Sequence, residues 1–155
     1  MAKTPTYKIP IYRCSMVKDR NVIRLPVGVG AGVGCMGNVE QVAQALHFLT
    51  DDSPTEVMVL FFLDGQNRLV GSEIVAKGGQ HGCAVVARDI LRSALVSGCS
   101  AFIVGHNHPS GDPTPSTEDL DMTASLLTAA KAIGLPFLDH IVVARNDKHR
   151  SIMGA

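Results

Sequence analysis

The sequence predicts an α/β fold in which helices pack against a mixed β-sheet. Three short runs rich in Val, Ile, Leu and Phe are typical of buried strands, at residues 57–63, 101–105 and 137–144. Segments with apolar residues at helical spacing precede and separate these runs, and they predict helices. The 155 residues are 46% apolar and 18% charged, which suits one compact domain with a buried core.

The N-terminal part of the chain differs from the rest. Residues 7–13 alternate polar and apolar side chains, which predicts a short edge strand where Pro10 is tolerated. Five glycines follow within residues 28–37, and Gly32, Gly34 and Gly37 have the G-x-G-x-x-G spacing of a dinucleotide-binding loop. No strong strand precedes them, however, so a linker is the favoured interpretation. We therefore expect a basic arm and Gly-rich linker over residues 1–37 and a domain over residues 38–155.

A helix is predicted to open the domain, capped by Asn38 with Gln41 at the reciprocal capping-box position. Its apolar face is formed by Val42, Ala45, Leu46 and Leu49. Residues 57–63 form the first buried strand and residues 64–67 a turn. Residues 68–75 return beside that strand, so the pair is predicted to be an antiparallel hairpin.

The next helix is predicted over residues 85–96, with Gly98 as its C-cap. Its inward face is expected to hold Val86, Ile90, Leu91, Ala94 and Leu95. A strand at 101–105 then leads into a Pro-rich loop that runs from His106 to Pro115.

Ser116 is predicted to open the third helix. We expect its inner face to hold Leu120, Ala124, Leu127 and Ala130. The strand at 137–144 follows, and residues 151–153 are expected to add a short one. The resulting order of elements is αββαβαβ, which favours helices against a mixed sheet.

The formal net charge is zero, which argues against a protein that mainly coats DNA. The absence of Trp argues against an aromatic platform for single-stranded nucleic acid. The charge is uneven, however: residues 1–25 carry six basic groups and one acidic group, whereas the remaining 130 residues carry eight basic and thirteen acidic groups. The basic arm is therefore the place to seek an anionic partner such as DNA.

No apolar run reaches the ~18 residues that a membrane-spanning helix needs, and the first residues lack the apolar stretch of a signal peptide. We expect a cytoplasmic protein without a membrane partner. The four cysteines include no C-x-x-C pair, so we expect reduced thiols.

Two histidines and an aspartate carry the strongest chemical signal. His106 and His108 are two residues apart at the end of a strand, and extended backbone directs such side chains to the same side. Asp119 lies in the first turn of the following helix. Two His and one carboxylate, with one position open, form the ligand set of a catalytic zinc site. A solvated His pair and a helix cap formed by Ser116 and Asp119 are the alternatives.

These residues resemble a known family. They match the pattern H-x-H-x(7)-S-x(2)-D of the JAMM (JAB/MPN) metalloproteases, and the string from His106 to Ser116 is similar to the RadC branch of that group. The resemblance covers about residues 38–153. It implies a cytidine-deaminase-like, three-layer α/β/α sandwich and a Zn²⁺ ion held by His106, His108 and Asp119.

The resemblance also implies a glutamate base near the first core strand. Glu56 stands immediately before that strand, and Glu73 on the neighbouring strand is the competitor. Zinc would lower the pKa of the attacking water, Glu56 would move its proton to the leaving amine, and Ser116 would stabilise the oxyanion. The expected reaction is hydrolysis of a peptide or isopeptide bond in a substrate that the sequence does not identify.

Other residues and other functions stay open. Asp139 and His140 either support the metal ligands or face solvent, and Asp112 is predicted to shape a turn. A zinc nucleobase deaminase is excluded, because the H-x-E and P-C-x-x-C motifs are absent. RadC-like proteins are named for DNA repair, so contact with DNA through residues 1–25 is an alternative, as is a non-catalytic MPN-type interaction module.

Overall fold

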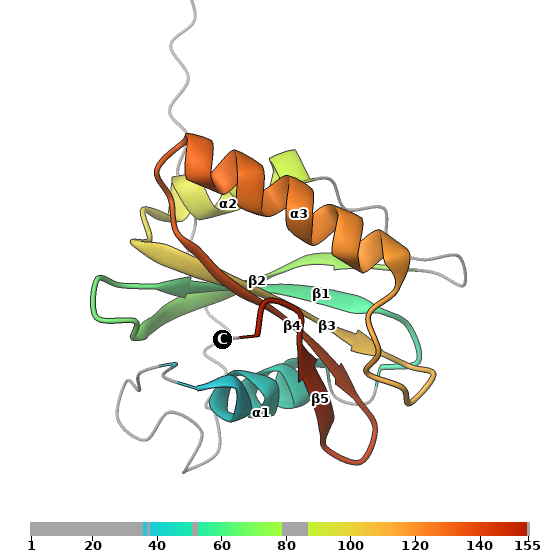
Figure 1. The fold of residues 1–155 in the computed structure, drawn as a ribbon. Coiled ribbons are helices and arrows are strands. Elements are labelled where there is room, and N and C mark those ends of the chain that lie inside the picture. The colour runs from blue at the N-terminus through green and yellow to red at the C-terminus, as the bar shows by residue number, and fades with distance from the viewer. Residues whose placement is uncertain (1–35, 37, 51–52, 79–86, 155) are drawn as a thin grey trace, which may run out of the picture.

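The computed structural model describes residues 36, 38–50, 53–78 and 87–154, which form a three-layer α/β/α sandwich. One helix covers one face of a five-stranded sheet and two helices cover the other (Figure 1). The elements are α1 (Val39–Thr50), β1 (Val57–Leu63), β2 (Leu69–Lys77), α2 (Ala87–Ser97), β3 (Ala101–His108), α3 (Thr117–Ala132), β4 (Phe137–Ala144) and β5 (Lys148–Ser151). The predicted fold class is therefore confirmed.

The sheet is mixed, with the strand order β2-β1-β3-β4-β5. Strands β3 and β4 run parallel and are joined through α3, whereas every other neighbouring pair is antiparallel. β1 and β3 lie in the interior of the sheet, and side chains on both of their faces are covered. This explains why β1 consists of seven consecutive buried apolar residues.

Alternation along the strands divides the core into two halves. Val59, Phe61 and Ile103 pack with α1, whereas Leu60 and Val104 pack with α2 and α3. Each fully buried side chain of this size contributes roughly 1.5–3 kcal/mol of hydrophobic stabilisation. The sheet is therefore held from both faces, which gives the ends of β1, β3 and β4 a rigid setting.

Helix α1 begins as predicted, because the Asn38 side chain accepts a hydrogen bond from the backbone N–H of Gln41 at 2.9 Å. Its inward face includes the buried residues Val42, Ala45 and Leu46. The close approach of this helix to the sheet depends on Gly105 of β3. A Cβ atom at that position would lie 2.6 Å from Leu46 Cδ2, well inside van der Waals contact.

The predicted hairpin of β1 and β2 is present, although β2 begins one residue later and ends two residues later than expected. Asp64 organises the turn, since its Oδ1 accepts the backbone N–H groups of Gln66 at 2.8 Å and Arg68 at 3.0 Å. Its Oδ2 accepts the Arg68 guanidinium at 2.7 Å. Asn67 has a φ of 56°, a conformation that asparagine tolerates better than most residues.

Strand β3 is longer than predicted. The Pro-rich loop does not begin at His106, because the strand continues through His108. The reason is pairing on both sides: His106 lies opposite Met58 of β1, and His108 lies opposite Ala144 of β4. The sheet thus continues past the point where the side chains change from apolar to polar.

The predicted inner face of α3 is wrong for three of its four residues. Leu120, Ala124 and Leu127 are exposed, and only Ala130 of that set is buried. The stripe that faces the sheet runs instead through Thr123, Leu126 and Ala130. Counted back at helical spacing, this stripe includes Asp119, so the helix is rotated to direct polar residues toward the strand ends.

Two smaller expectations also change. In α2, Ile90 and Ala94 are buried as predicted, but Leu95 is 56% exposed. The last strand is Lys148–Ser151 rather than residues 151–153, because Asn146 and Asp147 turn the chain early with φ values of 62° and 56°. Gly98 follows α2 with a φ of 69°, in agreement with the predicted C-cap.

The predicted edge strand at 7–13, the glycines at 28–34 and Gly37, and Val86 lie outside the described residues. Within the described ranges, no helix has the length and apolar character that crossing a bilayer requires.

Candidate metal centre

The candidate centre is built at the carboxyl end of β3. His106 and His108 continue the alternation of Phe102 and Val104, whose side chains face α2 and α3. His106 is almost fully buried, and His108 is partly exposed at the end of the strand. The period of the strand therefore directs both imidazoles to the face of the sheet that carries α3.

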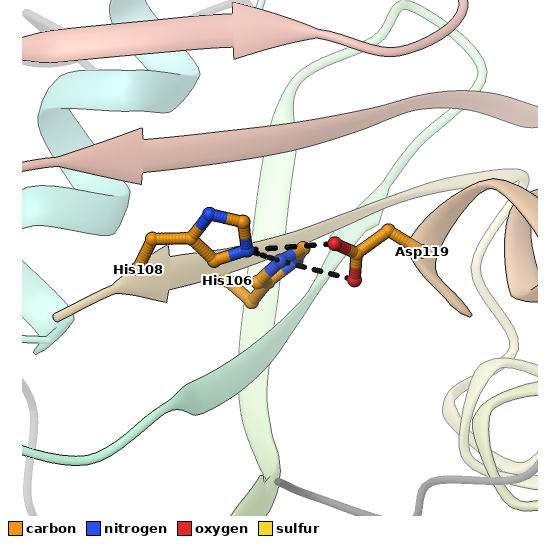
Figure 2. Close-up of side chains that lie close together, drawn as sticks. All are labelled: His106, His108 and Asp119. Carbon is orange, nitrogen blue, oxygen red and sulfur yellow. Dashed lines mark hydrogen bonds and ion pairs between the residues drawn. The ribbon is translucent and has the colours of Figure 1, made fainter. Parts of the chain in front are cut away.

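Asp119 approaches the two histidines from the first turn of α3 (Figure 2). The turn is held by a capping box, in which the Ser116 hydroxyl accepts the Asp119 backbone N–H at 3.1 Å and the Asp119 carboxylate accepts the Ser116 backbone N–H at 2.8 Å. The predicted helix cap is thus present, and the same side chain also faces the histidines. The two interpretations of Asp119 do not exclude each other.

The three side chains meet within hydrogen-bond distance. His106 Nε2 lies 3.2 Å from Asp119 Oδ1, His108 Nε2 lies 3.4 Å from Asp119 Oδ2, and the two Nε2 atoms are 2.9 Å apart. One candidate ligand atom from each residue falls within 4.8 Å of the others. Among the described residues, this is the group of His, Cys, Asp and Glu side chains that could hold a metal ion.

The protons on His108 test whether this group fits a cation. His108 Nδ1 lies 2.9 Å from the backbone carbonyl of Asp112, and a carbonyl only accepts hydrogen bonds. In its neutral form His108 therefore carries its proton on Nδ1 and directs a lone pair from Nε2 toward a carboxylate. Two electron-rich atoms at this distance require a proton or a metal ion between them, so the donor set fits a cation such as Zn²⁺.

The electrostatics of the group agree with that requirement. Burial raises the pKa of Asp119, but hydrogen bonds from His106 and His108 outweigh burial and hold the pKa well below its usual range. The hydrogen bond with Asp119 raises the pKa of His108 above its usual value, against the effect of burial. The site thus favours positive charge beside an ionised carboxylate.

Glu56 lies at the edge of this group. Glu56 directly precedes β1 and lies two residues before Met58, which pairs with His106 of β3. Glu56 is also close enough for its charge to contribute to the raised pKa of His108. The competitor, Glu73, lies opposite Leu60 on β2, so that β1 separates its strand from the strand of the histidines.

The segment that carries Glu56 is held by Asn107, a residue that sequence reasoning did not single out. The Asn107 side chain is buried on the opposite face of β3 from the histidines. Its Oδ1 accepts the backbone N–H of Val57 at 2.7 Å, and its Nδ2 donates to the carbonyls of Ser53 and Thr55 at 3.3 and 3.2 Å. The feature of the sequence that could have pointed to Asn107 is its position between the two candidate ligands His106 and His108.

The pair Asp139–His140 is divided between the two faces of the sheet. His140 is fully buried, and its Nε2 lies 2.9 Å from His106 Nδ1. Burial lowers the pKa of His140 to about 3, so the ring is neutral near pH 7. Asp139 instead accepts the backbone N–H groups of His140 and Met153. Only His140 of this pair supports a candidate ligand.

Thr123 completes the contacts behind the site, and it was also missed. Its hydroxyl oxygen lies 2.7 Å from His140 Nδ1 and 2.6 Å from the carbonyl of Asp119. The signal was its position four residues after Asp119, on the same side of the helix. Asp112 shapes the loop as predicted, since its Oδ1 accepts the Thr114 N–H at 2.9 Å.

Together, the fold and this group define an α/β/α domain with a candidate cation site at the end of a central strand. A family model described as the RadC-like JAB domain matches residues 36–154. This chain therefore belongs to the RadC-like JAB domain family.

Three similar curated proteins are each named only as a UPF0758 protein. The one from Carboxydothermus hydrogenoformans is 40% identical over 109 residues, which cover 70% of this chain and 48% of the relative. Those from Ruegeria pomeroyi and Actinobacillus pleuropneumoniae are 42% and 44% identical over 92 residues, which cover 59% of this chain and 41% and 42% of the relatives. The matched region of this chain spans less than half the length of each of these relatives.

Proposed function

We propose that this chain is a zinc-dependent hydrolase of the JAMM type that cleaves a peptide or isopeptide bond. The observation that carries the proposal is the convergence of His106 Nε2, His108 Nε2 and the Asp119 carboxylate on one point. Two imidazoles and one carboxylate leave a position open for water or substrate, as catalytic zinc sites do. Membership of the RadC-like JAB family supports the same proposal.

A bound Zn²⁺ ion supplies a hydroxide nucleophile near neutral pH and polarises the scissile carbonyl. The residues of the chain then have separate roles. Glu56, whose charge acts on His108, would accept a proton from the attacking water and deliver it to the leaving amine. His106, His108 and Asp119 would hold the ion, and Asn107 holds the segment before β1 that carries the proposed base.

Ser116 is proposed to donate a hydrogen bond to the oxyanion. Its hydroxyl lies 2.7 Å from Asp119 Oδ2 and donates to that oxygen. The oxyanion role therefore requires the hydroxyl hydrogen to turn from Asp119 toward the substrate, a rotation about a single bond. In either orientation the Ser116 backbone N–H continues to hold the Asp119 carboxylate.

Metal analysis tests the site directly. Protein purified without a His tag is expected to contain close to one equivalent of zinc, and His106→Ala is expected to lose most of it. A zinc content below about a tenth of an equivalent in the wild-type protein, unchanged by His106→Ala, would contradict the proposal.

Glu56→Gln separates hydrolysis from metal binding. The variant keeps the size of the side chain but removes the proton acceptor, so it should retain zinc and lose hydrolysis of peptides and isopeptide-linked substrates. Glu73→Gln is the matched control and should keep both. A non-catalytic MPN-type module would instead show no hydrolysis in the wild-type protein, even with zinc bound. Glu56→Gln would then have no activity to remove.

We further propose that any link to DNA repair acts through the basic arm. Residues 1–25 carry a net charge of +5, whereas the remaining residues carry −5. Contact with phosphates would make DNA affinity fall steeply with salt. Deletion of residues 1–25 should abolish that dependence, and an unchanged salt dependence after deletion would place the contact elsewhere.

A further inference from the structure

A chain of hydrogen bonds connects the strand that carries His106 to the helix that carries Asp119. It runs from the Asp119 backbone carbonyl to the Thr123 hydroxyl at 2.6 Å and on to His140 Nδ1 at 2.7 Å. It ends between His140 Nε2 and His106 Nδ1 at 2.9 Å. The chain therefore joins two candidate metal ligands without passing through the metal position.

The carbonyl at one end determines the direction of every bond in the chain. A carbonyl only accepts, so the single hydroxyl hydrogen of Thr123 is directed to Asp119. The Thr123 oxygen must then accept from His140 Nδ1–H. A neutral His140 with its proton on Nδ1 has an acceptor at Nε2, and that acceptor receives the proton of His106 Nδ1.

The outcome is a defined tautomer of His106. With its proton on Nδ1, His106 has a lone pair on Nε2, the atom that faces Asp119 and His108. The opposite tautomer would place a hydrogen on Nε2 and leave no lone pair for a metal. The Asp112 carbonyl sets the same tautomer for His108.

The chain of bonds is protected from water. His106, Thr123 and His140 are exposed by 2%, 6% and 0%, so solvent does not compete for these hydrogen bonds. The complete burial of the His140 ring also favours its neutral form. The three side chains come from β3, α3 and β4, so the chain of bonds ties the helix to two strands of the sheet.

We propose that Thr123 and His140 are positioning residues that set the Nδ1–H tautomer of His106 and thereby direct its Nε2 lone pair to the metal. The inference rests on the metal site proposed above. Thr123 is predicted to control metal affinity although the site's ligand atoms do not include it. Partners of this kind typically change metal affinity about 10- to 100-fold.

A matched pair at position 123 tests the proposal. Thr123→Val keeps the shape of the side chain but removes the hydroxyl, so His140 Nδ1 loses its acceptor. The proton of His140 is then more stable on Nε2, where it can donate a hydrogen bond to His106 Nδ1. The proton of His106 moves in turn from Nδ1 to Nε2, so neither ring gains or loses a proton. We expect zinc affinity, measured against a competing chelator, to fall about 10- to 100-fold in Thr123→Val and to stay within about threefold of wild type in Thr123→Ser.

Nitrogen-15 NMR of the metal-free protein provides the second measurement. At pH 8.5, the His106 resonances, assigned with His106→Ala, should show a protonated Nδ1 and an unprotonated Nε2. In Thr123→Val the two should exchange roles, which a merely structural effect of the substitution would not produce. This measurement on the wild-type protein needs neither the variants at position 123 nor a bound metal.

The outcomes separate the inference from the proposed function. Wild-type protein without zinc affinity would overturn the metal site, and the inference would then be decided by the tautomer alone. Equal zinc affinity in Thr123→Val and wild type would overturn the inference and leave the metal site standing. A proton on His106 Nε2 in the metal-free wild-type protein would also overturn it.

Discussion

The carboxylate of Asp119 contacts both Ser116, the N-cap of helix α3, and the two histidines of β3. Asp119 Oδ2 accepts both the backbone N–H and the hydroxyl of Ser116, at 2.8 and 2.7 Å. Oδ1 of the same carboxylate lies 3.2 Å from His106. The cap of α3 therefore also holds a candidate metal ligand beside the histidines.

Ser116→Ala should weaken both the helix and the site. Loss of the capping hydroxyl is expected to lower the free energy of unfolding by about 1 kcal/mol. It should also reduce zinc affinity, because the Asp119 carboxylate loses one of its two bonds to residue 116. Denaturant unfolding and chelator competition measure the two effects. Ser116→Thr, which keeps the hydroxyl, should preserve both; a loss of affinity in Ser116→Thr equal to that in Ser116→Ala would contradict this account.

Asn107→Ala should destabilise the fold and slow hydrolysis while leaving zinc affinity close to wild type. The substitution leaves the Val57 N–H and the carbonyls of Ser53 and Thr55 without their partner, at a cost of about 1–3 kcal/mol for each buried group left unsatisfied. The segment with Glu56 then loses its anchor. Kinetic constants measured beside zinc affinity would show the split.

Asn107→Asp provides the control for that prediction. Aspartate keeps the acceptor for Val57 but places a second oxygen against two carbonyls, so it should not restore stability. Wild-type stability in Asn107→Asp would mean that the bonds to Ser53 and Thr55 contribute little.

Gly105→Ala should be destabilising by about 1–3 kcal/mol, because the added methyl group would collide with Leu46 across a well-packed interface. Thermal or denaturant unfolding measures the loss. A second substitution, Leu46→Ala, makes room for that methyl group, so the double variant should lose less than the sum of the two single variants. Strict additivity would show that Gly105 is not required for the approach of α1.

The turn between β1 and β2 should make stability depend on pH through Asp64. Its pKa is lowered chiefly by hydrogen bonds from the backbone of Arg68 and Gln66. Because the pKa of Asp64 in the folded state lies below its ordinary value, the stabilising contribution of Asp64 is present above about pH 4 and is lost as the pH falls further. Unfolding measured between pH 6 and pH 2.5 should therefore show a larger loss in wild type than in Asp64→Asn. Parallel curves would exclude this role.

Much of the fold could be predicted because short-range chemistry determines it. The apolar run 57–63 forms β1 with the predicted bounds, and Asn38 and Ser116 cap helices as their side chains allow. The same holds for the candidate ligands. The two-residue period of a strand brings His106 and His108 to one face, and the spacing to Asp119 depends on one loop and one helical turn.

The rotation of α3 and the full length of β3 could not be read from local pattern. Leu120 and Leu127 have the helical spacing of an inner face, yet Thr123 and Leu126 occupy it. The rotation of a helix about its axis depends on the long-range contacts that each of its faces can make. In α3 these contacts are His140 for Thr123 and the histidine pair for Asp119. Likewise, only pairing with β1 and β4 extends β3 to His108.

The residue types and spacing in the sequence were thus sufficient to indicate the α/β class and the candidate ligands His106, His108 and Asp119. The residues that support the site, His140 of β4 behind His106 and Asn107 of β3 against the segment before β1, depended on which strands became neighbours. Residues 34 positions apart, such as His106 and His140, meet only because β3 and β4 pair in parallel with α3 above them. Hydrogen bonds between such residues require burial and register, which are properties of the assembled sheet rather than of any local segment.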